Sequence, residues 1–122
     1  FRFFLVKRQS RAVGYFCLSI AQGQARLADI WVQSGDIEDW HAAYGLALGR
    51  AAEEPGAVEM IAMGSSPLAH EVLIGAGFHL MESLPITVFG RGDLCQQGRS
   101  FLLQMADADF AFLHEGRRDY WV

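Results

Sequence analysis

The sequence predicts an α+β domain, within the wider α/β class, whose mixed and largely antiparallel sheet contains one parallel crossover. Three observations support this fold class. Aromatic and β-branched residues are concentrated in strand-like runs through the first 32 residues. After Asp39 the apolar residues recur at helical spacing, and a short apolar run follows that helix. A strand, a helix and a further strand in this order form a right-handed parallel crossover.

Three strands are predicted before the first helix, near residues 3–6, 12–20 and 25–32. The polar segment from Lys7 to Arg11 predicts a hairpin between the first two, and Gly23 marks the turn before the third. Alternation along the third strand predicts two faces. One face carries Leu27, Asp29 and Trp31, and the other carries Ala28, Ile30 and Val32.

Helical spacing predicts a first helix over residues 37–54. Its apolar face consists of Trp40, Ala43, Tyr44, Ala47 and Ala51. Asp36 is the expected N-cap, with Asp39 three residues on in a variant of the capping box. Gly45 and Gly49 each cost ~1 kcal/mol relative to alanine inside a helix, so we expect them to serve close packing of the helix against the sheet or against a partner chain.

The remaining predicted elements are a strand at 57–63, a helix at 66–76, and strands at 79–89 and 100–106. Ser66 is the expected N-cap of the second helix, Pro67 is its first residue and Gly77 ends it. All these elements fit a single domain spanning 1–122, because no linker or repeat interrupts the chain.

Composition and charge argue against several classes of protein. Hydrophobic residues make up 52% and charged residues 20%, which is a globular composition. The net charge is −4 with scattered Lys and Arg, so we expect no nucleic-acid partner. No apolar run approaches the ~18 residues of a membrane span, so we expect no membrane insertion. Cys17 and Cys95 are far apart and the histidines lack ligand spacing, which favours free thiols, no metal and a cytoplasmic location.

The order of the elements and several short segments resemble the C-terminal two-thirds of a GNAT-superfamily domain, the acyl-CoA-dependent N-acyltransferases. The most specific segment is SSPLAHEVLIGAGFHL, similar to the family's second crossover helix, with Gly77 and Phe78 matching its closing Gly-Phe pair. GYFCLSI and ARLADIWV resemble the antiparallel strands before the cofactor loop, and LLQMADADF is similar to the tail of some FemAB-like acyltransferases. The family's first strand and the two helices after it are missing, so we expect a piece of a longer protein.

The resemblance implies transfer of an acyl group from acetyl-CoA or another acyl-CoA to an amine acceptor, whose identity stays open. In the family, a Gln/Arg-x-x-Gly-x-Gly/Ala loop holds the pyrophosphate. Here the basic position falls on Ile37 and the first glycine on Trp40, and only Ala42 fits, so the cofactor loop is degenerate. The tyrosine that often serves as general acid falls on Leu73, and an asparagine often found earlier falls on Ser66.

The resemblance also implies a cofactor site made mostly of main-chain groups from the third strand and the two helix starts. Its candidate residues are Ile30, Trp31, Val32, Asp39, Trp40, His41, Ala42 and Ser66. Asp29 is the candidate catalytic base, because it lies on a central strand near the family's carboxylate. The alternative for Asp29 is a structural role, either facing solvent or paired with Arg26 or another cation.

The loop before the first helix favours a second hypothesis. Asp36, Glu38 and Asp39 lie at the positive end of the helix dipole and would repel a diphosphate, and Trp40 would obstruct close backbone approach. On this hypothesis the chain is a catalytically silent GNAT-like module that binds a ligand or partner, or forms a homodimer. A second copy or the missing N-terminal segment would then cover the exposed apolar sheet.

Overall fold

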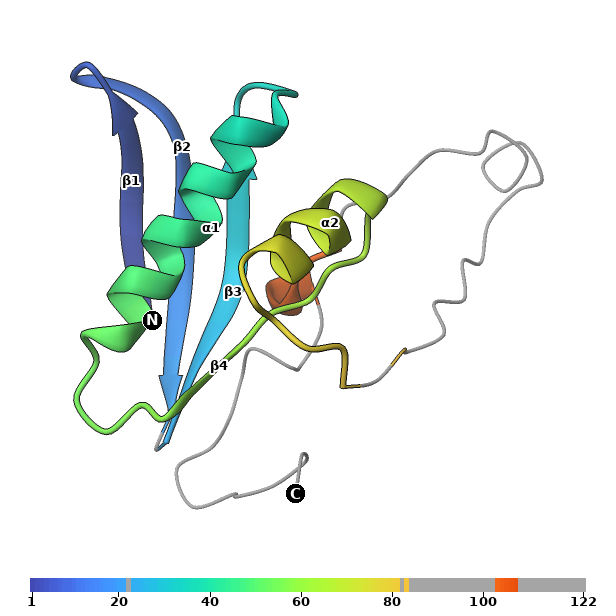
Figure 1. Ribbon diagram of the computed structural model, residues 1–122. Helices are drawn as coiled ribbons and strands as arrows, with labels where there is room; N and C mark the ends of the chain where they lie inside the picture. Colours follow the sequence, from blue (N-terminus) through green and yellow to red (C-terminus); the bar gives the residue numbers. More distant parts are fainter. Residues whose placement is uncertain (22, 82, 84–102, 108–122) are drawn as a thin grey trace.

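The computed structural model describes residues 1–21, 23–81, 83 and 103–107, which form a four-stranded sheet with two α-helices on one side (Figure 1). The strands are β1 (Arg2–Arg8), β2 (Arg11–Ala21), β3 (Gln24–Val32) and β4 (Glu59–Ile61), in the order β1-β2-β3-β4. The helices are α1 (Ile37–Ala52), α2 (Pro67–Gly75) and the short 3-10 helix η1 (Met105–Asp107). The first three strands are antiparallel, and β4 is parallel to β3. The predicted α+β class and the mixed sheet with a parallel crossover are confirmed for this part of the chain.

The crossover strand is shorter than predicted. Instead of spanning 57–63, β4 consists of Glu59–Ile61, because only this stretch lies against β3. The first helix also ends earlier than the predicted residue 54, with Glu53 as its C-cap. Chain beyond Ile61 therefore leaves the sheet before it reaches α2.

The two strands predicted after the second helix lie mostly outside the described residues. Of 79–89, the structure describes 79–81 and 83, which are not in a strand. Of 100–106, it describes 103–106, where η1 begins instead of a strand. The Asp107 carboxylate accepts a hydrogen bond from the Gln104 N–H at 2.8 Å, and such a local bond favours a turn.

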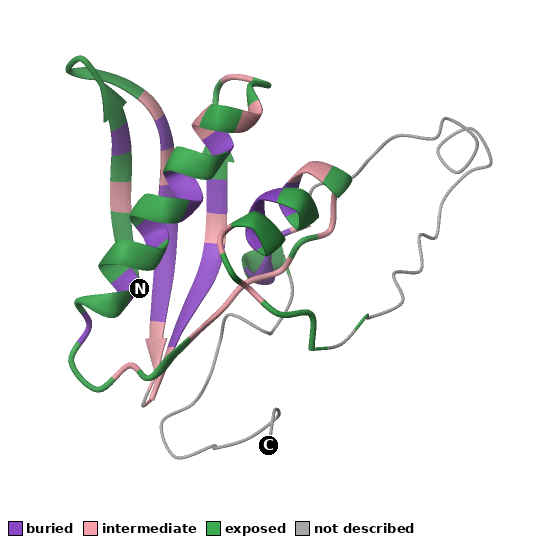
Figure 2. Ribbon diagram, in the orientation of Figure 1, coloured by how far each residue is buried: buried purple, intermediate pink, exposed green. Residues whose placement is uncertain are grey.

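α1 packs on β2 and β3, and α2 packs against α1 on the same side of the sheet, so that the buried sides of both helices belong to one core (Figure 2). The largest fully buried side chains are Tyr44, Leu18, Leu27, Ile30 and Val72. The predicted caps are confirmed: Asp36 accepts from the Glu38 N–H at 3.1 Å, and Ser66 accepts from the Ala69 N–H at 3.1 Å. Local sequence thus sets where each helix begins, and burial fixes each helix in this core.

A β-bulge in β3 reverses the faces predicted for part of that strand. Leu18 pairs with Leu27 and Cys17 pairs with Asp29, which leaves Ala28 as the extra residue. Leu27 therefore packs in the helix-side core, whereas Ala28 packs with Cys17 on the opposite face. The prediction that Leu27 shares a face with Asp29 is wrong, because alternation does not continue across a bulge.

The sheet face opposite the helices is only partly covered by the described residues, through Met105 of η1. Phe3 and Leu5 of β1 are 74% and 67% exposed, and Trp31 of β3 is 46% exposed. The strand register places Leu5, Tyr15 and Trp31 side by side across three strands. We call the surface formed by Phe3, Leu5, Tyr15 and Trp31 the open face.

Candidate functional site

Along the second half of β3, one edge has no neighbouring strand among the described residues. The pairing of β3 with β4 covers only Gln24–Arg26, so no described strand lies beside the remainder on that side. The Gln33 N–H donates to the Val13 carbonyl on β2 at 2.8 Å. Because hydrogen-bonding direction alternates along a strand, the main-chain groups of Ile30 and Val32 point away from β2. We call these outward-pointing main-chain groups of residues 27–32 the β3 edge.

The segment that contains η1 lies against the β3 edge. The buried side chain of Gln104 donates from Nε2 to the Ile30 carbonyl at 3.1 Å. The Ser65 hydroxyl accepts from the Leu103 N–H at 2.6 Å and donates to the Leu103 carbonyl at 3.0 Å. This segment therefore contacts the β3 edge through the Gln104 side-chain amide, and the chain that leads into α2 through the Leu103 main chain.

Asp29 and Tyr15 form a hydrogen-bonded pair on the side of the sheet away from the helices. The Tyr15 hydroxyl donates to Asp29 Oδ2 at 2.7 Å. The centroid of the Tyr15 ring lies 6.4 Å from the centroid of the Trp31 ring, and the two rings are stacked. Of the structural roles considered for Asp29, an ion pair with Arg26 is not found among the described residues. The Arg26 guanidinium donates to the Gln24 side chain at 2.9 Å.

Tyr15 is a candidate functional residue that the sequence did not single out. Its hydrogen bond to Asp29 is the largest influence on its pKa, which is raised above the usual value, with burial acting in the same direction. The phenol therefore stays protonated at neutral pH and can keep donating to the carboxylate. The signal that could have identified Tyr15 is its position opposite Trp31, and that position follows only once the register of β2 against β3 is known.

The carboxylates of the loop before α1 are all engaged within the protein or exposed at the helix start. Asp36 caps the helix, and its own N–H donates to the Ser34 hydroxyl at 3.3 Å. Asp39 accepts from the Ser34 hydroxyl at 2.7 Å and forms an ion pair with Arg8 of β1. Asp39 therefore does not complete the predicted capping box. It ties the loop to the β1–β2 hairpin.

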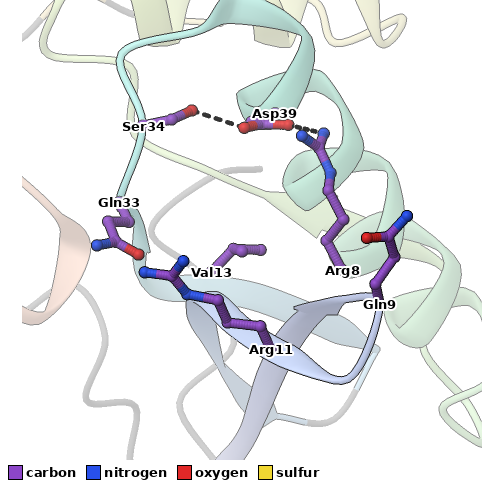
Figure 3. Close-up of a pocket in the computed structure, with 7 residues that line it drawn as sticks. All are labelled: Arg8, Gln9, Arg11, Val13, Gln33, Ser34 and Asp39. Carbon is purple, nitrogen blue, oxygen red and sulfur yellow. Dashed lines mark hydrogen bonds and ion pairs between the residues drawn. The ribbon is translucent and has the colours of Figure 1, made fainter.

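A hollow of about 520 Å³ lies at the end of the sheet where β3 runs into α1 (Figure 3). We call it the hairpin hollow, and it is lined by Arg8, Gln9, Arg11, Val13, Gln33, Ser34 and Asp39. Gln9 and Ser10 form a two-residue turn with φ angles of 47° and 69°, the left-handed conformation of tight hairpins. The fold therefore brings two arginines from the hairpin to a loop that has no basic residue of its own.

Trp40 was expected to obstruct this loop, but its ring lies in the core. The side chain is 7% exposed, packs against Tyr44, and donates from Nε1 to the Ser34 carbonyl at 3.1 Å. It is not part of the lining of the hairpin hollow. The indole instead fixes the path of the loop from the inside.

The structure does not gather the predicted site residues into one pocket. The side chains of Ile30 and Val32 are buried beneath the helices, and those of Asp29 and Trp31 lie on the opposite face. Asp39 lines the hairpin hollow. The others lie at the helix starts: His41 is exposed beside Gly75 of α2, Ala42 is exposed, and Ser66 caps α2.

Comparison of the chain with protein-family models, curated proteins and solved structures gives no match. Within the described ranges, no group of three or more His, Cys, Asp or Glu side chains is placed to hold a metal ion. No helix among the same residues is long and apolar enough to cross a membrane. Function must therefore be inferred from the geometry of the chain itself.

Proposed function

We propose that the protein is a GNAT-like N-acyltransferase that transfers an acyl group from acetyl-CoA or another acyl-CoA to an amine. The observation that carries this proposal is the β3 edge, which pairs with no strand in the described part of the chain and is contacted by the segment that contains η1. β3 separates from β4 after Arg26, and the edge lies between the loop before α1 and the chain that leads into α2. Ligands of α/β folds commonly bind where strands diverge at their carboxyl ends.

The β3 edge suits the pantetheine arm of acyl-CoA, which contains two amide groups in an extended chain. Exposed strand edges bind extended amide-bearing ligands through main-chain hydrogen bonds. The Gln104 amide already makes one such bond, to the Ile30 carbonyl. We infer that a pantetheine amide would take the place of this side chain, with the Val32 main chain beside it.

The proposed reaction is direct attack of a neutral amine on the thioester carbonyl carbon. Main-chain N–H groups of the β3 edge would polarise the carbonyl oxygen. As the carbon–nitrogen bond forms and the carbon–sulfur bond breaks, CoA leaves as a thiolate and the amine proton passes to Asp29. Tyr15 would hold the Asp29 carboxylate in position through its 2.7 Å hydrogen bond.

Thermal unfolding with and without ligand tests whether acyl-CoA binds at all. Acetyl-CoA at about a hundred times its Kd should add ~2.7 kcal/mol to the free energy of unfolding. In a domain near this size, each kcal/mol moves the midpoint by ~3–6 °C. Free 3′-phospho-ADP is the control for binding of the nucleotide alone. An unchanged midpoint at millimolar acetyl-CoA and longer acyl-CoA, in a sample shown to be folded, would rule the proposal out.

Self-association is the second candidate function, and the open face favours it. Phe3, Leu5 and Trp31 are large apolar side chains that stay exposed on one side of the sheet. Contiguous apolar patches of this kind often mark protein–protein contacts, and a second copy could bury them across a two-fold axis. This role is compatible with a catalytically silent domain.

Sedimentation of variants tests the second candidate. Wild type should sediment as a dimer at tens of micromolar, and Phe3→Lys should be monomeric. Leu46→Lys is the matched control, because Leu46 is an apolar residue of α1 that is 51% exposed on the other side of the domain. A monomeric wild type, or dimers that persist in Phe3→Lys, would exclude self-association through the open face.

A further inference from the structure

We propose that Arg8 and Arg11 form a phosphate-binding site in the hairpin hollow and hold a phosphate of the acyl-CoA. This inference rests on the proposed function for the identity of the ligand. The proposed phosphate ligands are side chains of the β1–β2 hairpin and not main-chain groups of the loop before α1. Arg8 lies 31 positions before Asp39 in the sequence.

The charges of the hairpin hollow favour an anion. Arg8 and Arg11 contribute two positive charges and Asp39 contributes one negative charge, so the lining carries a net charge of +1. The chain as a whole carries −4. Of the three loop carboxylates, only Asp39 lines the hollow, and it is already paired with Arg8 and accepts from Ser34. Asp36 caps α1, and Glu38 is exposed in the first turn of that helix.

The hydrogen-bond donors of the hollow favour a phosphate. The Arg8 side chain is 62% exposed even while it contacts Asp39, so part of its guanidinium stays available. Arg11 has no ion pair in the described part of the chain, and it lies beside Gln33 in Figure 3. Guanidinium groups bind phosphate oxygens through paired, charge-assisted hydrogen bonds.

The fold fixes the two arginines relative to each other and to the β3 edge. Arg8 and Arg11 are directly paired in the register, as the last pair of the β1–β2 ladder, with a two-residue turn between them. The Asp39 ion pair further restrains Arg8. Gln33 and Ser34 continue directly from Val32, so the hollow and the β3 edge lie at the same end of β3. A ligand that extends along this edge can therefore present its phosphates to the hollow.

Calorimetric titration of the whole chain tests the site. The probes are acetyl-CoA, 3′-phospho-ADP, inorganic pyrophosphate, and acetyl-pantetheine, which lacks the phosphates. Arg11→Gln should weaken binding of acetyl-CoA and of 3′-phospho-ADP about tenfold or more, and should leave acetyl-pantetheine unchanged. Arg50→Gln is the control, since it removes the same charge from the far end of α1. Wild-type affinity for the phosphate-bearing probes should also fall with added salt.

The outcomes separate this inference from the proposed function. If Arg11→Gln binds acetyl-CoA as tightly as wild type does, the phosphate site is wrong and acyl-CoA binding stands. A second outcome is that wild type binds 3′-phospho-ADP through Arg11, has no affinity for acetyl-pantetheine, and binds acetyl-CoA no more tightly than 3′-phospho-ADP. In that case the phosphate site stands and the acyltransferase proposal fails. Equal losses in Arg11→Gln and Arg50→Gln would reduce the effect to net charge and overturn the site. Pyrophosphate binding alone, without 3′-phospho-ADP, would also overturn it.

Discussion

The Tyr15 hydroxyl donates a hydrogen bond to Asp29 Oδ2 at 2.7 Å, directly beside the bulge at Ala28. In a regular strand Leu27 and Asp29 would share a face, because they are two residues apart. The bulge places them on opposite faces, so Leu27 fills the core while the Asp29 carboxylate lies with Tyr15 on the other side. One extra residue thus moves a carboxylate out of the apolar core and next to a tyrosine.

Asp29→Asn should abolish most acyl transfer if Asp29 accepts the amine proton. The expected loss in kcat is about 10²- to 10⁴-fold, with little change in KM for acyl-CoA, because the amide cannot take up a proton. Tyr15→Phe keeps the carboxylate and removes only its hydrogen bond, so its loss should be smaller. Steady-state kinetics with both substrates varied measure the two effects. Full activity in Asp29→Asn would remove Asp29 from the mechanism.

Tyr44→Phe should stabilise the domain or leave its stability unchanged. The Tyr44 hydroxyl is buried, and no residue in the described part of the chain hydrogen-bonds to it. A buried hydroxyl without a partner costs on the order of 1 kcal/mol, and phenylalanine has the same shape without that group. Urea unfolding at pH 7 measures the change. A clear loss of stability would indicate a partner for the hydroxyl, such as a bound water.

Tyr44→Phe should also make the stability of the domain less dependent on pH above pH 9. Burial raises the pKa of Tyr44 from 10.0 to about 12 in the folded protein. The protonated form is therefore favoured by folding, so this contribution is complete below pH 10 and is lost as the pH rises toward 12, by at most ~2.7 kcal/mol. Wild type should lose stability in this window, and Tyr44→Phe should lose less. Parallel stability curves between pH 9 and 12 would contradict the prediction.

Gly14→Ala should destabilise the sheet, whereas Gly49→Ala should not. A Cβ at position 14 would lie 2.5 Å from the Trp31 carbonyl oxygen, which belongs to the backbone of β3 and cannot move freely. The expected cost is about 1–3 kcal/mol. At Gly49, and likewise at Gly45, a Cβ would meet nothing within 4 Å in the described structure. In the described structure these glycines therefore do not serve close packing of α1 against the sheet, and Gly49→Ala should add about 0.5–1 kcal/mol. Their packing against a partner chain stays a prediction. Urea unfolding of both variants checks the contrast.

The sequence was informative where structure depends on neighbouring residues. Asp36 and Ser66 could be predicted as caps because a cap depends only on a nearby N–H group. Asp36 accepts from the N–H two residues on, and Ser66 accepts from the N–H three residues on. The helix-side core followed from period-3.6 spacing, and the hairpin from its polar turn. These features need no knowledge of register.

The candidate site was less predictable because its contacts cross the sheet. Tyr15 meets Asp29 through the pairing of β2 with β3, and Arg8 reaches Asp39 across 31 positions of sequence. The bulge at Ala28 has no glycine or proline to mark it. Alternation alone therefore placed Leu27 on the wrong face, and inspection of the loop alone overlooked the two arginines that the hairpin brings to it.

The buried carboxylate of Glu54 should make Arg2 important for stability. Its side chain is 5% exposed and bonds to Arg2 at 2.6 Å, which joins the first strand to the end of α1. Arg2→Gln would leave that carboxylate without its cation, at an expected cost of about 1–3 kcal/mol. Arg50→Gln is the control, because Arg50 and Glu53 are 54% and 65% exposed and such pairs contribute less than ~1 kcal/mol. Equal effects in urea unfolding would mean that Arg2 contributes no more than a surface charge.

Ser10→Gly should stabilise the hairpin that carries Arg8 and Arg11. Ser10 has a φ of 69°, in the left-handed region where glycine has no steric penalty and other residues do. The two-residue turn prefers glycine at this position, so the variant should gain about 0.5–1 kcal/mol in urea unfolding. Ser10 does not line the hairpin hollow, so the affinity for 3′-phospho-ADP should not change. A loss of that affinity in a stabilised variant would mean that the strained turn itself, and not only its two arginines, shapes the hollow.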